Sequence, residues 1–142
     1  MIIDATNLIL GRMASVAAKE LLKGEKVIIV NAEESVISGA RSSILEKYRE
    51  RRERKSIVNP ARHGPFFPRR PEGIVRRAVR GMLPYKKAKG RNAFKNLKVY
   101  IGIPKELEGK EIKTLEIANA SKLRVPKHIK LKELCNLLGA RF

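Results

Sequence analysis

The 142-residue sequence has no tryptophan, a single cysteine (Cys135) and few aromatic residues, which make up 5% of the chain. One cysteine excludes an internal disulfide and fits a reducing compartment, so we expect a cytoplasmic protein. One cysteine and two histidines, His63 and His128, are too few for a zinc site of the usual Cys/His spacing, and we expect no metal and no other cofactor. Because aromatic residues are scarce, the core must consist mainly of Ile, Leu, Val and Ala.

Long apolar runs are also missing. No stretch of about 18 apolar residues occurs, so we expect no segment that spans a bilayer. Hydrophobic residues nevertheless make up 43% of the chain, which is near the norm for globular proteins and argues against disorder throughout. At this length we expect one domain covering residues 1–142.

Acidic residues are scarce as well: 14 Asp and Glu stand against 32 Lys and Arg, which gives a net charge of +18. A foldable chain with this charge points to a polyanionic partner, and without a membrane-spanning run nucleic acid is the better candidate. The excess is local, because residues 41–98 hold 19 basic and 4 acidic residues, a net +15, and no acidic residue lies between Glu72 and Glu106. We therefore expect residues 41–98 to be the binding segment.

The two ends of the chain have the pattern of a folded scaffold. Apolar residues recur at spacings of three and four from residue 10 to 22, which predicts a helix. The β-branched run 26–31 predicts a strand buried on both faces, and the short apolar opening 2–5 predicts a strand before the helix. Strand, helix and strand in about 30 residues form a βαβ unit, so we expect an α/β fold with a parallel sheet. Two further strands and a terminal helix are expected at 97–103, 35–38 and 129–138.

The basic segment begins with a predicted helix that starts at Ser43, where Glu46 has the spacing of a capping box. Its later turns carry Arg49 and Arg52 and have almost no apolar face. Two interpretations stay open for them. The helix either lies on a phosphate backbone or presents a solvated face that nearby glutamates balance.

A proline-rich loop follows at 59–71, where four prolines and one glycine forbid a long regular element. Long loops of this kind are usually functional or disordered. Phe66 and Phe67 next to Arg69 and Arg70 combine stacking surfaces with phosphate ligands, a mixture suited to RNA. We expect at least one of the two phenylalanines to pack on the core.

The most informative piece is a predicted helix over 72–83 with apolar residues on one face and Arg76, Arg77 and Arg80 on the other. The following segment, 85–96, has five basic residues and no acidic one. Five like charges repel one another unless a polyanion neutralises them, so phosphate is the favoured partner. Residues 56–70 and 85–96 are both expected to be poorly ordered without RNA, because they bury little and repel themselves.

Four blocks of the sequence resemble the large-subunit ribosomal protein L-thirteen family. They are IDATNLILGRMAS (Ile3–Ser15), KVIIVNAE (Lys26–Glu33), AVRGMLP (Ala78–Pro84) and LKVYIG (Leu97–Gly102). The order and spacing of the blocks match along roughly the first 105 residues. The basic segment between them is similar to the archaeal and eukaryotic branch, and the short C-terminal tail favours the archaeal form.

The resemblance implies a three-layer α/β/α domain with a small, mainly parallel sheet and basic extensions. It implies binding to large-subunit ribosomal RNA beside neighbouring ribosomal proteins, support of early subunit assembly, and no catalysis or small-molecule substrate. By the match of blocks, the expected RNA ligands are Arg12, His63, Arg69, Arg70, Arg76, Arg77, Arg80, Lys86, Lys87, Lys89 and Arg91. The charge pattern adds Arg49, Arg52, Arg62 and Lys95.

Other functions fit the sequence less well than ribosomal RNA binding. The turn at 5–12 has one glycine and neither the G-x-G-x-x-G nor the Walker A pattern, so it lacks a phosphate cradle and argues against a nucleotide enzyme. Cys135 lies among leucines and is expected to be a buried apolar residue, not a nucleophile. A duplex-DNA binder, another structured-RNA binder and a translational regulator outside the ribosome are the alternatives; no compact helix-turn-helix spacing supports the DNA binder.

Overall fold

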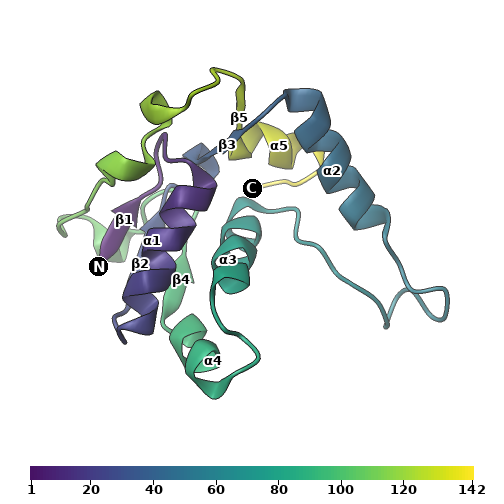
Figure 1. Cartoon of the computed structure of the whole chain (residues 1–142), viewed down its shortest axis with the longest axis horizontal. Coiled ribbons are helices and arrows are strands. Elements are labelled where there is room, and N and C mark those ends of the chain that lie inside the picture. The colour runs from purple at the N-terminus through teal and green to yellow at the C-terminus, as the bar shows by residue number, and fades with distance from the viewer.

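A computed structural model describes all residues from 1 to 142 (Figure 1). Its strands and helices, in chain order, are β1 (Ile2–Asp4), α1 (Leu10–Leu22), β2 (Val27–Val30), β3 (Val36–Ser38), α2 (Arg41–Glu53), α3 (Pro71–Met82), α4 (Ala88–Lys95), β4 (Leu97–Val99), β5 (His128–Lys130) and α5 (Leu131–Leu137). Four short 3-10 helices are η1 (Ala32–Glu34), η2 (Lys105–Leu107), η3 (Glu116–Ala118) and η4 (Ala120–Lys122). The predicted α/β class is confirmed.

The main sheet has three parallel strands in the order β1-β2-β4. Ile3 lies beside Ile29, and Ile29 beside Val99, so β-branched side chains line one face. The predicted strand 97–103 is shorter in the structure, since β4 ends at Val99. Beyond it the backbone turns at Gly102 (φ 64°), whose N–H donates to the Glu33 carboxylate at 3.1 Å.

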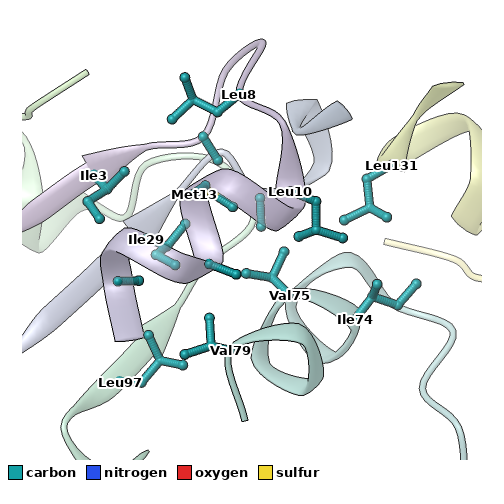
Figure 2. Packing of buried hydrophobic residues seen from close by; sticks show 14 of the residues in the cluster. Ile3, Leu8, Leu10, Met13, Ile29, Ile74, Val75, Val79, Leu97 and Leu131 are labelled. Carbon is teal, nitrogen blue, oxygen red and sulfur yellow. The ribbon is translucent and has the colours of Figure 1, made fainter. Parts of the chain in front are cut away.

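The hydrophobic core lies between this face of the sheet and helices α1 and α3 (Figure 2). Helix α1 has the predicted bounds and buries Met13 and Leu21, while α3 contributes Val75 and Val79 to the same cluster of 25 buried residues. Aliphatic side chains and alanine dominate the cluster, as the low aromatic content predicts. No helix of the chain combines the length and the apolar character that crossing a membrane requires.

A second, two-stranded sheet joins β3 to β5 in antiparallel pairing. The strand predicted at 35–38 is therefore present, but its partner is a segment predicted to be helical. The terminal helix begins at Leu131 and not at residue 129, because Ile129 pairs with Ile37 and is buried in the strand. This pairing is not apparent from the sequence because about 90 residues separate the strands and each has only three residues.

The basic segment departs from the predictions in two places. Helix α2 begins at Arg41, and its N-cap residue, Ala40, makes no side-chain cap, so the predicted capping box at Ser43 is wrong. The helix is already closed by the hydrogen bond from Ile44 N–H to Ala40 C=O, 3.0 Å. Residues 88–95 form α4, a helix that the sequence did not predict; Ala93 is buried in the core cluster and Gly90 against the turn at Pro84 and Tyr85. Helix α3 lies within one residue of its predicted bounds.

Candidate nucleic-acid interface

Helix α2 and the proline-rich loop project away from the sheet, and the chain returns to the body through α3 and α4 (Figure 1). This excursion, residues 41–98, contains most of the excess positive charge of the chain. Few of its cations are neutralised internally, since only three of the 19 make an ion pair: Arg41 with Glu133 (2.7 Å), Arg54 with Glu50 (2.7 Å) and Arg70 with Glu72 (3.0 Å). From Arg76 to Lys98 no cation has a carboxylate partner.

Two exposed arginines of α3 rest on aromatic rings, one from the turn before α4 and one from α4 itself. The Arg76 guanidinium lies 5.2 Å from the Phe94 ring centre, and the Arg80 guanidinium lies 4.3 Å from that of Tyr85. The two rings pack edge to face, 5.5 Å apart at 87°. The rings thus fix the position of α4 beside α3 and support both guanidinium groups at once.

A third arginine of α3 holds the proline-rich loop. Arg77 donates a hydrogen bond to the Phe66 carbonyl oxygen (2.7 Å), and its guanidinium lies 4.0 Å from the Phe67 ring centre. Phe66 is 63% exposed, and neither phenylalanine belongs to the core cluster or packs against it. The prediction that at least one of them packs on the core is therefore wrong, because the Phe67 ring packs on a guanidinium group instead.

The contact of a guanidinium group with an aromatic ring affects how strongly that group can bind a ligand. A cation–π contact at an exposed site contributes about 0.5–1 kcal/mol and restricts a side chain that would otherwise be mobile. A restricted guanidinium loses less conformational entropy when it binds a phosphate or stacks on a base. The exposed arginines of α3 are therefore partly organised for a ligand before it arrives.

The structure also brings together three of the expected ligands from different parts of the excursion. Arg52, His63 and Arg69 line a hollow of about 240 Å³ in the proline-rich loop, together with Lys55. Arg52 has a second contact, since its Nη1 donates to the Leu138 carbonyl oxygen at 2.9 Å and ties α2 to the end of α5.

The remaining cations near α4 are exposed to solvent. They include five of the expected ligands: Lys86, Lys87, Lys89, Arg91 and Lys95. Glycine is required between them at Gly90, because a Cβ there would overlap the Pro84 carbonyl group and lie 2.9 Å from the Tyr85 nitrogen. This close approach folds the lysine-rich turn back against its own helix.

Three expected ligands lie apart from these groups. Arg12, on α1, has its guanidinium 3.4 Å from the Ile117 carbonyl oxygen. Arg49 lies on a face of α2 that includes Glu50 and Glu53, which matches the solvated alternative for that face. Arg62 is exposed in the turn after Asn59, in the middle of the loop.

Sequence reasoning missed the residues that support the site. Tyr85 and Phe94 are not among the expected ligands, and neither is the pair formed by Arg51 over the Tyr48 ring at 5.4 Å. The available signal was that most aromatic residues of the chain lie in or next to the basic segment.

Taken together, an α/β scaffold and an exposed, unneutralised surface of ring-supported arginines define a class: basic proteins that bind a polyanion through one charged segment of a nearly neutral scaffold. Comparison with known proteins gives the family. Residues 1–106 match the family "Ribosomal protein L13", and the chain belongs to it.

Curated relatives cover nearly the whole chain. Each of the following is named "Large ribosomal subunit protein uL13". The protein of Methanosphaera stadtmanae is 52% identical over 99% of this chain and 98% of its own length, and that of Methanocaldococcus jannaschii has the same identity and coverage. The protein of Methanosarcina barkeri is 50% identical over 99% of both chains. The predicted family and its archaeal form are confirmed.

Proposed function

We propose that the chain is a structural constituent of the large ribosomal subunit, that it binds ribosomal RNA through the excursion, and that it supports early subunit assembly. The observation that carries the proposal is the set of exposed cations on α3 and α4 without carboxylate partners. Membership of the ribosomal L13 family, a structural and non-enzymatic family, supports it. We also propose that neighbouring proteins of the large ribosomal subunit contact this chain.

The geometry favours structured RNA over duplex DNA. A duplex reader places a helix or a β-ribbon in a regular groove. Here the basic surface is spread over two helices, a turn and an irregular loop, and Phe66 is presented to solvent. Bulges and loops in RNA match such a surface because their bases are unstacked and available to rings and guanidinium groups.

The residues proposed to contact RNA fall into two groups. The α3–α4 surface comprises Arg76, Arg77, Arg80, Lys86, Lys87, Lys89, Arg91 and Lys95. The loop surface comprises Arg52, Arg62, His63, Arg69 and Arg70. Arg12 and Arg49 are proposed as peripheral contacts, since neither lies with these groups.

Competition binding at fixed salt tests the proposal. Labelled large-subunit ribosomal RNA is bound to the whole chain and challenged with unlabelled ribosomal RNA, duplex DNA and a structured RNA of non-ribosomal origin. We expect only unlabelled ribosomal RNA to displace the label at low concentration. If duplex DNA or unrelated RNA displaces it equally well, the ribosomal assignment fails and a general nucleic-acid binder takes its place.

A further inference from the structure

A hollow of about 340 Å³ opens where α2, the proline-rich loop and α3 meet. Apolar groups of Pro68, Ile74 and Ala78 line it, and so do the rings of Tyr48 and Phe67. Its volume lies at the lower end of the range for small-ligand sites, about 300–1,000 Å³. The space suits one flat group and is far too small for a nucleic-acid duplex.

Both rings in this hollow face a guanidinium group that also lines it. Arg51 lies over Tyr48 at 5.4 Å and Arg77 lies over Phe67 at 4.0 Å. Two planar cations and two aromatic rings therefore surround an apolar interior. No carboxylate lines the hollow, so nothing within it neutralises the two charges.

This combination matches the chemistry of an unpaired RNA base. A base stacks on aromatic rings and guanidinium planes, and guanidinium N–H groups donate to its edge or to the adjoining phosphate. A free phosphate would not make use of the apolar lining, and an apolar peptide side chain would not make use of the two guanidinium groups.

We propose that this hollow receives a single unstacked base of the RNA that the excursion binds, with Arg51 and Arg77 holding the base and its phosphate. The inference rests on the proposed function and adds a subsite to it. Neither Arg51 nor Tyr48 is among the ligands expected from the sequence. The subsite makes α2 a partner of α3 in binding, even though the opposite face of α2 is balanced by glutamates.

Filling the hollow without changing charge tests the inference. Ala78→Leu adds bulk to the lining, and Ala78→Ser is the matched control that leaves the space open. We expect Ala78→Leu to weaken binding of transcribed large-subunit ribosomal RNA by about five- to 150-fold, the range for losing one stacked base. The slope of log K against log salt should change by no more than one phosphate contact, roughly 0.7–0.9, because the cations outside the hollow are untouched. Ala78→Ser should bind like the unsubstituted chain.

Circular dichroism melts establish that each variant folds, and Phe67→Leu, which removes a ring but keeps apolar volume, replaces Ala78→Leu if that variant is unfolded. Affinity within twofold of the unsubstituted chain would overturn the inference while leaving the proposed function intact. Failure of the unsubstituted chain to prefer ribosomal RNA over duplex DNA would instead overturn the proposed function. Normal binding to free RNA with poor retention in assembled subunits would show that a neighbouring protein occupies the hollow, and would also overturn the inference.

Discussion

At the scale of single residues, the arginines of α3 depend on rings that the sequence places well away from them. Arg76 rests on Phe94, eighteen positions later, and Arg80 rests on Tyr85 across the turn that follows α3. Each ring limits the freedom of its arginine and leaves the guanidinium group exposed. The proposed binding surface should therefore depend on uncharged residues as well as on charge.

Replacement of Phe94 tests this dependence. Phe94→Leu keeps an apolar side chain but removes the ring under Arg76 and the edge contact with Tyr85. We expect ribosomal RNA affinity to fall about two- to fivefold, as loss of a cation–π contact of about 0.5–1 kcal/mol implies, with an unchanged salt slope. Filter binding over a salt series measures both quantities. Phe142→Leu, at the exposed terminus, is the control, and an equal loss in that variant would contradict the argument.

Two glycines in helices should respond in opposite directions to the same substitution. At Gly90 a Cβ meets backbone of Pro84 and Tyr85, which cannot move away cheaply, so Gly90→Ala should lower the free energy of unfolding by about 1–3 kcal/mol. At Gly81, inside α3, no atom lies within 4 Å of the added Cβ, so Gly81→Ala should raise it by about 0.5–1 kcal/mol. Urea unfolding measures both. If Gly90→Ala raised the free energy of unfolding, the turn at Pro84 and Tyr85 would have to move away from the added Cβ at little cost.

Cys135 gives a prediction for pH. Burial of the thiol, and secondarily the charge of Glu72, raises its pKa to about 12 from the ordinary 9.0. Since the unfolded chain loses this proton at lower pH than the folded one, the contribution of Cys135 to stability is full below about pH 9 and falls as pH rises toward 12. The slope contributed is at most about 1.4 kcal/mol per pH unit.

Urea unfolding of the unsubstituted chain and of Cys135→Ala at pH 8, 9, 10 and 11 tests this effect. Cys135→Ala is expected to be less stable at pH 8 because it leaves a small cavity. The difference between the two proteins should shrink as pH rises from 9 to 11. A constant difference would show that the thiol ionises equally easily in both states.

At the scale of elements, the parts predicted well are those whose structure is decided locally. Helix α1 and strand β2 follow from apolar periodicity and a β-branched run, and α3 follows from its amphipathic pattern. Strand β5 was missed because its single apolar residue is buried by pairing with a distant strand. Helix α4 was missed because the small residues that anchor it, Gly90 and Ala93, give no apolar stripe.

The candidate site also has a part that could be predicted from the sequence and a part that could not. Charge is a property of composition, so the basic segment and its unpaired stretch were predicted from counting alone. Which cations meet one another is a matter of tertiary structure, so the shared hollow of Arg52, His63 and Arg69 could not be predicted from their spacing. The supporting rings were missed for the same reason.

The C-terminal half of helix α2 should depend on one hydrogen bond for its position. Ile44, Leu45 and the Arg41–Glu133 ion pair hold the N-terminal half, and Arg52 ties the C-terminal half to the Leu138 carbonyl oxygen. In Arg52→Ala we expect amide hydrogen exchange of the last two turns of α2 to accelerate several-fold, because local opening no longer breaks this contact. Arg49→Ala, an exposed arginine on the same helix without such a bond, is the control. Equal protection in both variants would show that α2 is held by other contacts.

At the scale of the whole molecule, most of the positive charge and most of the hydrophobic core lie in different parts of the sequence. A net +15 lies in residues 41–98, while the other 84 residues carry +3 and supply most of the core. This arrangement lets the scaffold fold without strong self-repulsion and places the repelling charges on an excursion where a polyanion can neutralise them. Most of the net charge of +18 is thus concentrated in the segment proposed to bind RNA.

The most direct test of this claim compares two sets of lysines that differ only in position. One variant carries Lys86→Gln, Lys87→Gln and Lys89→Gln; the other carries Lys110→Gln, Lys122→Gln and Lys132→Gln, which are equally exposed but lie outside the excursion. The measurement is the slope of log K against log salt for ribosomal RNA. Each lost phosphate contact should reduce the magnitude of this slope by roughly 0.7–0.9. The slope of the first variant should therefore be smaller by about 2–3, and the slope of the second should be almost unchanged. An equal change in the two variants would contradict the account.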